Sequence, residues 1–238
     1  VYGGEYFIMG YDIILWDVDG TLMDFKAAEK QALSGCLQEL GVEPADALIG
    51  EYSRINISYW KRFERGELSK EEVLLGRFVE FLEKEHLPGT PEKVLWSYEE
   101  KLSHTWFIQD DSLELCRILK AKGFHQYVVT NGWSFVQRTK LEESGFNPVM
   151  DGCFISDDLG VQKPKKEFFE ACFTEIFGRP EPSAEERSRV LIVGDSLTSD
   201  MLGGLNVGID RCWYSSPGEN ENPEIPVTCR IKHLWELL

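Results

Sequence analysis

The sequence predicts an α/β protein: a Rossmann-like parallel sheet with helices on both faces, and an all-helical domain inserted after the first strand. Three observations carry this prediction. Short apolar runs recur along the chain, helical patterns alternate with them, and one long segment breaks the alternation with helical patterns alone. Alternating strands and helices are typical of a parallel sheet, because each crossover helix returns the chain to the same edge.

The predicted strands are short apolar runs bounded by turn residues. The five clear ones are residues 13–16, 127–129, 153–155, 190–193 and 209–214. A sixth and weaker run covers residues 227–231. Because the runs are continuous rather than alternating, we expect a sheet that is covered on both faces.

Helical patterns fill the gaps between these strands. One begins at Ser112 and ends at Gly123, and a second spans residues 134–145. A third runs from Pro164, which we place in the first turn, to Gly178. Proline suits the first turn of a helix, and glycine suits the position just after its end. Residues 215–226 are rich in Gly, Pro, Asn and Glu, so we expect a surface loop before the last strand.

The segment 22–108 contains no convincing strand. Its amphipathic helical stretches are residues 26–40, 44–64, 69–86 and 91–105. Ser69 and Glu72 have the spacing of a capping box at the start of the third stretch. We therefore expect a core domain made of residues 9–21 and 109–238, with a helical cap domain inserted over the edge where such sheets bind ligands.

Composition and charge limit the function classes. The chain has 238 residues, with 25 Lys and Arg against 41 Asp and Glu, for a net charge of −16. This balance argues against a nucleic-acid polymer as partner, because such binding needs many cations. It does not exclude a small anionic substrate, since a bound metal ion and a few local donors override a distant field.

The same reasoning bears on the compartment. The six cysteines are scattered without a C-x-x-C pair, so we expect reduced thiols in a cytoplasmic protein. No stretch reaches the length of a membrane span, so no membrane partner is expected. Residues 1–8 precede Met9 and make a poor signal peptide, and we leave them out of the fold prediction.

Polar residues and one glycine lie where several of the predicted strands end or where a nearby helix begins. In chain order they are Asp17, Asp19, Thr130, Asn131, Gly132, Lys163, Asp195 and Asp200. The ends of parallel strands lie along one edge of a sheet, so residues far apart in the sequence can converge there. Three carboxylates, one cation and one hydroxyl at one point are what phosphoryl transfer through an aspartyl-phosphate needs.

Taken singly, each motif has a simpler interpretation. Asn131 and Gly132 form a common turn pair, and Lys163 is compatible with a solvated surface charge. Asp200 is compatible with a helix cap. Two carboxylates at the end of a buried strand, Asp17 and Asp19, are harder to dismiss, because burial is costly unless a cation meets them. Mg²⁺ suits such oxygen ligands.

In this order, the motifs resemble those of the haloacid dehalogenase superfamily of phosphohydrolases. The resemblance covers essentially the whole chain, because residues 22–108 are similar to that family's helical cap. It implies that Asp17 attacks phosphorus and becomes phosphorylated. It also implies that Asp19 protonates the departing oxygen and then takes a proton from the hydrolytic water.

The resemblance further implies a ligand set. Mg²⁺ is expected on the Asp17 and Asp195 carboxylates and the Asp19 backbone carbonyl. The phosphoryl oxygens are expected on the remaining motif residues, with one aspartate as outer support. These are Thr130, Asn131, Gly132 and Lys163 for the phosphate, and Asp200 for the support of Lys163 or of a water.

A finer similarity links the chain to the house-cleaning 5′-nucleotidases of this superfamily, through residues 194–214 and the stretch around Trp60. It implies a small phosphorylated metabolite as substrate, a nucleoside 5′-monophosphate first, with phosphoglycolate or a sugar phosphate as alternatives. Trp60 and Asn56 are candidate nucleobase contacts. Most of the tryptophans are expected in the core or between domains. We expect a monomer.

Other functions compete with this one. A dehalogenase lacks the second aspartate, so Asp19 argues against it, whereas a phosphomutase shares both aspartates and stays open. A receiver-like binding module switched by phosphorylation is about half as long and has no helical insertion. A catalytically silent interaction protein is expected to have lost a charged position, and none is missing here.

Overall fold

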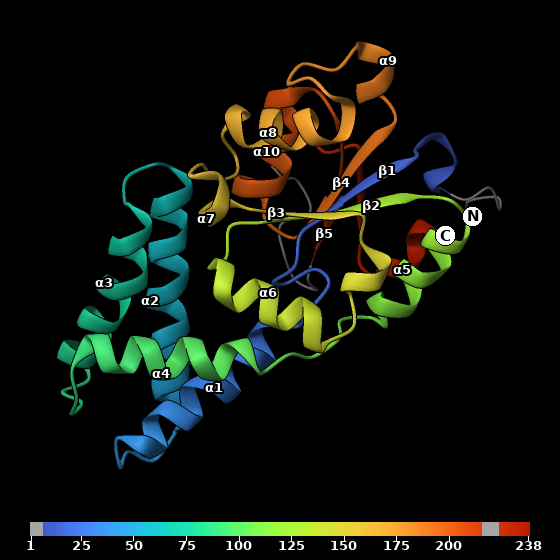
Figure 1. The fold of residues 1–238 in the computed structure, drawn as a ribbon. Helices are drawn as coiled ribbons and strands as arrows, with labels where there is room; N and C mark the ends of the chain where they lie inside the picture. The colour runs from blue at the N-terminus through green and yellow to red at the C-terminus, as the bar shows by residue number, and fades with distance from the viewer. Residues whose placement is uncertain (1–6, 216–223) are drawn as a thin grey trace. The chain divides into compact units, whose positions relative to one another are not determined.

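The computed structural model describes residues 7–215 and 224–238. The chain forms two compact units. The α/β unit combines the residues up to Asp24 with Ile108–Leu238, and the helical unit is Phe25–Phe107 (Figure 1). Most of the loop predicted at 215–226 lies outside the described residues.

The α/β unit is built on a six-stranded parallel sheet in the order β3-β2-β1-β4-β5-β6. Its strands are β1 (Ile13–Trp16), β2 (His125–Thr130), β3 (Gly152–Ile155), β4 (Val190–Gly194), β5 (Asp210–Tyr214) and β6 (Cys229–Ile231). Every predicted strand is present, including the weak last one. The chain order reverses beside β1, whose neighbours are β2 and β4.

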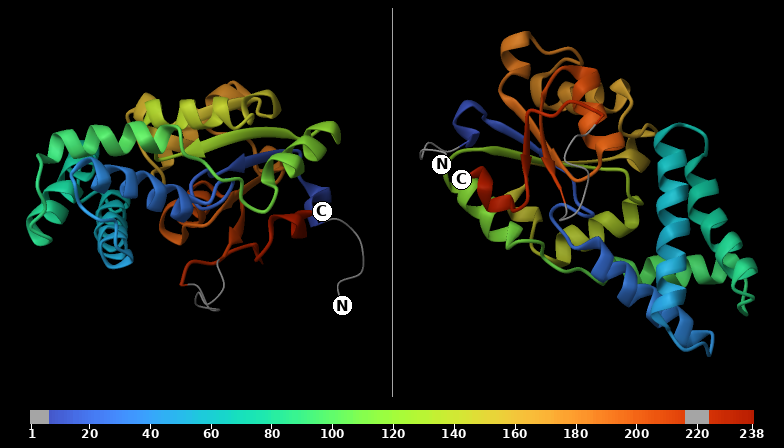
Figure 2. Two further views of the ribbon diagram at one scale, coloured as in Figure 1. Left: turned by 90° about the horizontal axis from the view of Figure 1, so that it is seen from below. Right: turned by 180° about the vertical axis from the view of Figure 1, so that it is seen from behind.

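Helices cover both faces of this sheet, α8 and α10 on one side and α5 and α6 on the other (Figures 1 and 2). The helices are α5 (Ser112–Ala121), α6 (Ser134–Glu143), α7 (Ser156–Leu159), α8 (Lys166–Phe177), α9 (Ala184–Arg187) and α10 (Leu202–Val207). Single turns lie at η1 (Phe7–Gly10), η2 (Asn147–Val149), η4 (Leu234–Leu237) and, as a π-helical turn, η3 (Leu197–Met201).

The expected place of Pro164 in the first turn of a helix is wrong. Helix α8 begins at Lys166, and Pro164 lies in the turn before it. That turn is closed by the Lys165 amide, which donates to the carbonyl of Gln162 at 3.0 Å. The Pro164 carbonyl accepts from the Asn206 side chain at 2.9 Å, which ties the turn to α10.

Strand β1 shows why continuous apolar runs predict a covered sheet. Ile13 and Leu15 belong to a core cluster that includes the aromatic residues of α8. Ile14 and Trp16 are equally buried on the alternate side of the strand. The Trp16 indole donates to the side chain of Gln126 at 3.1 Å, so its polar atom is satisfied inside the protein.

The insertion leaves and re-enters the α/β unit at neighbouring points. Met23 and Ile108 form an antiparallel β-bridge. The Gln109 amide donates to the carbonyl of Leu22 at 3.0 Å, and the Ser112 hydroxyl donates to the same carbonyl at 2.6 Å. The chain therefore leaves and re-enters the α/β unit at points that are held together by hydrogen bonds within that unit.

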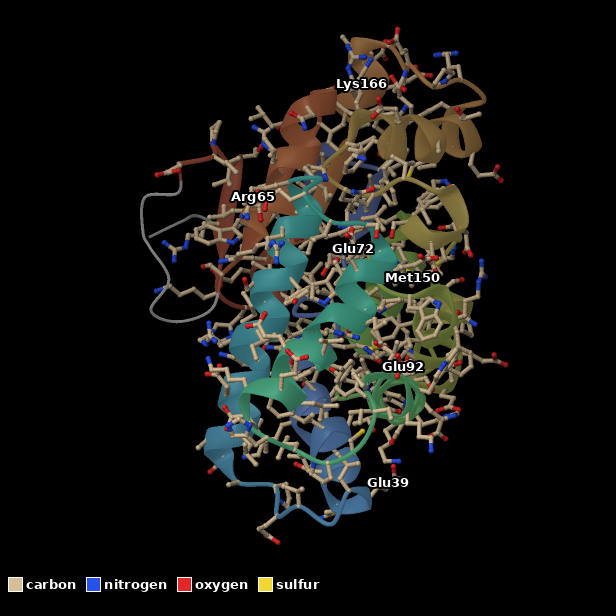
Figure 3. All side chains as sticks on the ribbon, turned by 90° about the vertical axis from the view of Figure 1, so that its left-hand side faces the viewer. Glu39, Arg65, Glu72, Glu92, Met150 and Lys166 are labelled. Carbon is tan, nitrogen blue, oxygen red and sulfur yellow. The ribbon has the colours of Figure 1, made fainter. Side chains whose placement is uncertain are left out.

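The helical unit contains four helices where the sequence predicts helical stretches. They are α1 (Phe25–Glu39), α2 (Asp46–Glu64), α3 (Lys70–Lys84) and α4 (Pro91–Ser103). The predicted capping box is confirmed: the Ser69 hydroxyl accepts from the Glu72 amide, and Glu72 accepts from the Ser69 amide. Arg65, Glu72 and Glu92 lie on the exposed surface of this unit (Figure 3).

No helix of the described ranges has both the length and the apolar character needed to cross a bilayer.

A buried polar network links the helices of this unit. The Asn56 amide donates to Glu29 at 2.7 Å and accepts from Arg77 at 2.8 Å. Arg77 also forms an ion pair with Glu99. The expectation that Asn56 contacts a nucleobase is wrong, because these partners occupy its amide and its exposed fraction is only 1%.

The tryptophans divide between core and surface. Trp16 and Trp213 are buried, as expected, and Trp60 is partly buried. Trp96 and Trp235 are exposed and are exceptions to the expectation that most tryptophans are buried.

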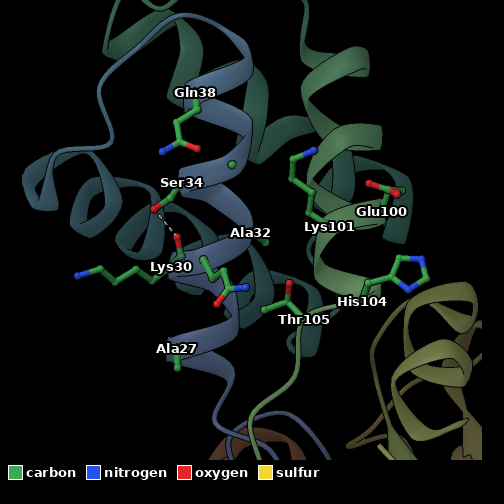
Figure 4. Close-up of a pocket in the computed structure, with 11 residues that line it drawn as sticks. Ala27, Lys30, Ala32, Ser34, Gln38, Glu100, Lys101, His104 and Thr105 are labelled. Atoms are coloured by element: carbon green, nitrogen blue, oxygen red, sulfur yellow. Dashed lines mark hydrogen bonds between the residues drawn. The ribbon is translucent and has the colours of Figure 1, made fainter. Parts of the chain in front are cut away.

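The helical unit also carries a pocket of about 790 Å³ between α1 and α4 (Figure 4). Its lysines already have acidic partners: Lys30 binds Asp46 at 2.8 Å, and Lys101 binds Glu39 at 2.6 Å. None of the predicted site residues lines it. The predicted site residues belong instead to the α/β unit, most of them at the ends of its strands.

Candidate active site

The site begins where β1 and β4 end side by side. Trp16 pairs with Val193 in the parallel register, so Asp17 and Asp195 leave the sheet one and two residues further on. The Asp17 amide donates to the carbonyl of Val193 at 3.0 Å, which continues the ladder to the nucleophile candidate. In open α/β sheets, the crevice at the point where strand order reverses is where ligands bind.

Lys163 is the centre of the hydrogen-bond network at this edge. Its ammonium donates to Asp17 Oδ1 at 2.8 Å, to Asp200 Oδ1 at 2.6 Å and to the carbonyl of Val129 at 2.7 Å. These bonds use all three ammonium protons. Burial lowers the pKa of Lys163, but the two carboxylates outweigh it and leave that pKa above its ordinary value. Lys163 is therefore a buried, charged lysine.

Three carboxylates gather around this lysine. One oxygen each of Asp17, Asp195 and Asp200 lies within 4.8 Å of the other two. Burial raises the pKa of Asp17 to about 7, although Lys163 pulls it down. Burial, with the charges of Asp17 and Asp200, holds the pKa of Asp195 well above its usual range. One lysine does not balance three carboxylates, so the cluster favours an additional cation.

The donor set fits a hard divalent ion such as Mg²⁺, because it consists of oxygens. Gly20 makes room for the carboxylate of Asp195 at the turn after β1. A Cβ there would lie 2.5 Å from Asp195 Oδ2, and the φ of +96° is one that side-chain-bearing residues rarely adopt. Asp17 and Asp195 are two of the three clustered carboxylates and would hold the ion; the Asp19 carbonyl as a further ligand stays a prediction. Asp200 is engaged elsewhere, through Lys163 and the Ser196 amide at 3.1 Å.

Asn131, the first residue after β2, holds the backbone of Lys163 in place. The Asn131 side chain donates to the carbonyl of Lys163 and accepts from its amide, both at 2.9 Å. The Gly132 amide donates to the hydroxyl of buried Thr130 at 3.1 Å. The Asn131 side chain thus orients Lys163, and the phosphate contacts expected of these residues stay a prediction.

Asp19 has two partners that the sequence analysis missed. Gln137 Nε2 donates to its Oδ2 at 2.6 Å, and Lys140 Nζ donates to its Oδ1 at 2.7 Å. Both partners lie on α6. A signal was present: Lys140 stands four residues after the apolar Val136, on the face of the helix that turns inward, where lysine is rare.

Comparison with known proteins assigns the family. The sequence model of the haloacid dehalogenase-like hydrolases matches residues 11–208. The chain is 35% identical to the HAD-hydrolase YfnB of Bacillus subtilis, with 95% of this chain and 94% of YfnB aligned. It is 33% identical to the pyrimidine 5′-nucleotidase PynA of Streptococcus pneumoniae, over 97% and 94%. It is 28% identical to the pyrimidine 5′-nucleotidase YjjG of Escherichia coli, over 96% and 97%.

The solved structures agree. A crystal structure of YfnB from Bacillus subtilis, bound to magnesium, has a TM-score of 0.84, with 33% identity over 95% of this chain and 96% of that one. The sheet order and the helices on both of its faces are thus those of a known architecture. On this evidence, the chain belongs to the haloacid dehalogenase-like hydrolases.

Proposed function

We propose that this hydrolase is a Mg²⁺-dependent phosphatase that cleaves a small phosphomonoester through an aspartyl-phosphate on Asp17, and that its substrate is a nucleoside 5′-monophosphate. One observation carries the proposal. The Asp17 carboxylate stands at the end of β1, 2.8 Å from the ammonium of Lys163, with an Asp195 oxygen within 4.8 Å. A nucleophile, a fixed positive charge and a cation site thus share one buried point.

In the first step, an oxygen of Asp17 attacks phosphorus. The Asp17 O–P bond forms as the ester P–O bond breaks, and Asp19 gives its proton to the departing oxygen. Lys163, which already contacts Asp17, offsets charge on the phosphoryl oxygens. Bound Mg²⁺, held by Asp17, Asp195 and the Asp19 carbonyl, would supply further positive charge at the same place.

In the second step, water attacks the phosphorus of the aspartyl-phosphate. Asp19, now a carboxylate, accepts the proton of that water. The Asp17 O–P bond breaks, which releases inorganic phosphate and restores the Asp17 carboxylate. Asp200 contributes by holding Lys163, whose ammonium lies 2.6 Å from Asp200 Oδ1.

The choice of a nucleotide is supported by the relatives. Two proteins aligned over nearly their whole length carry the name pyrimidine 5′-nucleotidase. Trp60, on α2, is partly exposed and stays a candidate base contact, with the ammonium of Lys70 over its ring, 5.2 Å from the centroid. Phosphoglycolate and sugar phosphates are the competing substrates, since the family also contains a relative named ribulose-1,5-bisphosphate 5-phosphatase.

A phosphate-release screen tests the proposal. Nucleoside 5′-monophosphates, phosphoglycolate and sugar phosphates are each incubated with the enzyme and Mg²⁺, with and without a chelator. We expect release from the nucleotides, and abolition by the chelator and by Asp17→Asn. Asp158→Asn is the matched control, because that carboxylate is paired with Arg138 on the surface and should keep full activity.

Full activity in Asp17→Asn or in chelator would overturn the phosphatase mechanism. A preference for non-nucleotide esters would remove only the nucleotide. Transfer of phosphate to a second metabolite rather than to water would indicate a phosphomutase.

We propose further that the enzyme acts as a cytoplasmic monomer. All six cysteines are free, which is what a reducing compartment maintains. Light scattering on the purified protein measures the mass directly, and a mass above that of one chain would contradict the monomer.

A further inference from the structure

We propose that Gln137 and Lys140 are positioning residues that fix the carboxylate of Asp19 for proton transfer. The proposal rests on the acid–base role given to Asp19 above and adds the two side chains that aim it. Neither was expected from the sequence, and both come from one helix, α6 (Ser134–Glu143).

The geometry is that of a clamp on both carboxylate oxygens. Lys140 Nζ lies 2.7 Å from Asp19 Oδ1, and Gln137 Nε2 lies 2.6 Å from Asp19 Oδ2. Residues three apart on a helix lie on the same face. One rigid element therefore reaches both oxygens at once, which fixes the rotation of the carboxylate as well as its place.

The two donors of the clamp, Lys140 and Gln137, are more deeply buried than the carboxylate that they hold. Lys140 and Gln137 are each 1% exposed, whereas the Asp19 side chain is 23% exposed. Burying a lysine is costly and needs a partner of opposite charge. The Gln137 carbonyl has no hydrogen-bond partner among the described residues. Burying either side chain of α6 is unfavourable by itself. Both of them contact the partly exposed carboxylate of Asp19.

The loop after β2 is shaped to admit Gln137. A Cβ on Gly132 would lie 2.3 Å from Gln137 Nε2 and 2.7 Å from its Cδ. The φ of Gly132 is not in the left-handed region, so space rather than backbone conformation requires glycine here. The backbone of Gly132 thus lies against the side chain that donates to Asp19.

The clamp matters because a general acid works only within hydrogen-bond reach of the atom that it protonates. The proton moves from an Asp19 oxygen to the leaving oxygen as the P–O bond breaks, and it returns from water in the second step. Lys140 keeps its own protons and transfers none. Its effect is on where Asp19 sits.

The test compares two leaving groups in Lys140→Met. A nucleoside 5′-monophosphate leaves as an alkoxide, which must be protonated, whereas nitrophenyl phosphate leaves as a stable anion, which needs no acid. We expect kcat on the nucleotide to fall about 100-fold, the cost of a misplaced catalytic group, with little change on nitrophenyl phosphate. Gln137→Ala should show the same selectivity to a smaller extent.

Controls separate positioning from folding. Arg138→Met removes a cation from the same helix that faces Asp158 instead, and it should leave both rates unchanged. Lys140→Arg keeps the charge and should recover part of the nucleotide rate. In an Asp19→Asn background, Lys140→Met should cost nothing more, because the group through which it acts is already disabled.

An equal loss on both substrates, or no loss on either, in Lys140→Met would overturn the proposal. If the wild-type enzyme releases no phosphate, or if Asp17→Asn is fully active, the proposed function itself has failed and the clamp falls with it.

Discussion

Lys163 joins the chemistry of the site to its architecture. It binds the nucleophile candidate Asp17, the carboxylate of Asp200 and a carbonyl of β2. The Asn131 side chain fixes the backbone of the same residue from both sides. Removing the ammonium therefore has two expected effects, since it leaves buried carboxylates unpaired and takes away positive charge from the transition state proposed above.

We expect Lys163→Met to lower kcat by about 10²–10³-fold, the usual cost of losing one preorganised electrostatic donor. The free energy of unfolding should also fall by roughly 3–5 kcal/mol, because breaking a buried pair leaves uncompensated charge. Kinetics and urea denaturation measure the two effects. Lys166→Met is the matched control, a lysine three residues further on that pairs with Glu170 and Glu181 at the surface. Equal losses in both variants would contradict the assignment.

Gly20→Ala tests the space beside Asp195. The new methyl would lie 2.5 Å from Asp195 Oδ2, at a φ of +96°, so we expect weaker activation by Mg²⁺ and a lower stability. Gly123→Ala is the control, because its φ is +92° and no atom lies within 4 Å of its Cβ. The backbone penalty is shared and amounts to about 1–3 kcal/mol. Only the Mg²⁺ titration of activity should differ between the two, and identical curves would count against the metal site.

The residues of the site and of the helical unit differ in how far the sequence predicts their roles. Asp17 and Asp195 were predictable because they follow buried strands, where a carboxylate is conspicuous. Gln137 and Lys140 were missed because a polar residue on a helix is expected to face solvent. The sequence does not show that Asp19 lies beside them in the fold. Asn56 misled for the same reason, since its partners come from other helices of the helical unit.

At the scale of elements, Asp151 joins α5 to the sheet. It accepts from Lys120 Nζ at 2.5 Å and from the Gln126 amide at 2.8 Å, and so links the helix to the start of β2. Burial raises the pKa of Asp151, but these hydrogen bonds outweigh it and leave that pKa below its ordinary value.

A depressed pKa means that the folded protein favours the charged form of Asp151. Its stabilisation is present above 3.8, the ordinary pKa, and is lost as the pH falls through the lower folded value. Asp151→Asn should lower the free energy of unfolding by about 0.5 kcal/mol at neutral pH, as for other half-exposed pairs. Urea denaturation across the acidic range measures it. A deficit that stays constant into strong acid would contradict this.

The elements themselves were largely predictable. All six strands lie at the expected runs. The central strands β1 and β4 are apolar and buried throughout, as strands covered on both faces are, and such short runs differ from helices in length. The start of α8 was misplaced by two residues. Proline there fits a first turn and a preceding turn equally well, and the choice depends on contacts with Asn206 that no local pattern contains.

At the scale of the whole molecule, each unit buries a polar network of its own. The α/β unit buries Lys163 with Asp17 and Asp200 beside its apolar core, and the helical unit buries the ion pair of Arg77 and Glu99 together with Glu29 and Asn56. Each unit has its own set of buried contacts, so damage to one interior should be felt there first.

We expect Arg77→Met to destabilise the helical unit by about 3–5 kcal/mol, because Glu99 is left buried without its partner. Hydrogen exchange followed by mass spectrometry should show faster exchange within 25–107 and unchanged protection in β1 and β4. Arg65→Met is the control, since Arg65 pairs with Glu67 in solvent. Loss of protection spread evenly over both units would show that they unfold together.

The bridge between Met23 and Ile108 has a consequence for how such an enzyme can change. Strand partners of this kind stand only about 5 Å apart, so a few residues of linker would close the gap if the whole insertion were excised. The segment can thus be exchanged for another of different length without disturbing a single ladder of the sheet. New selectivity could be grafted here while the reacting groups keep their places.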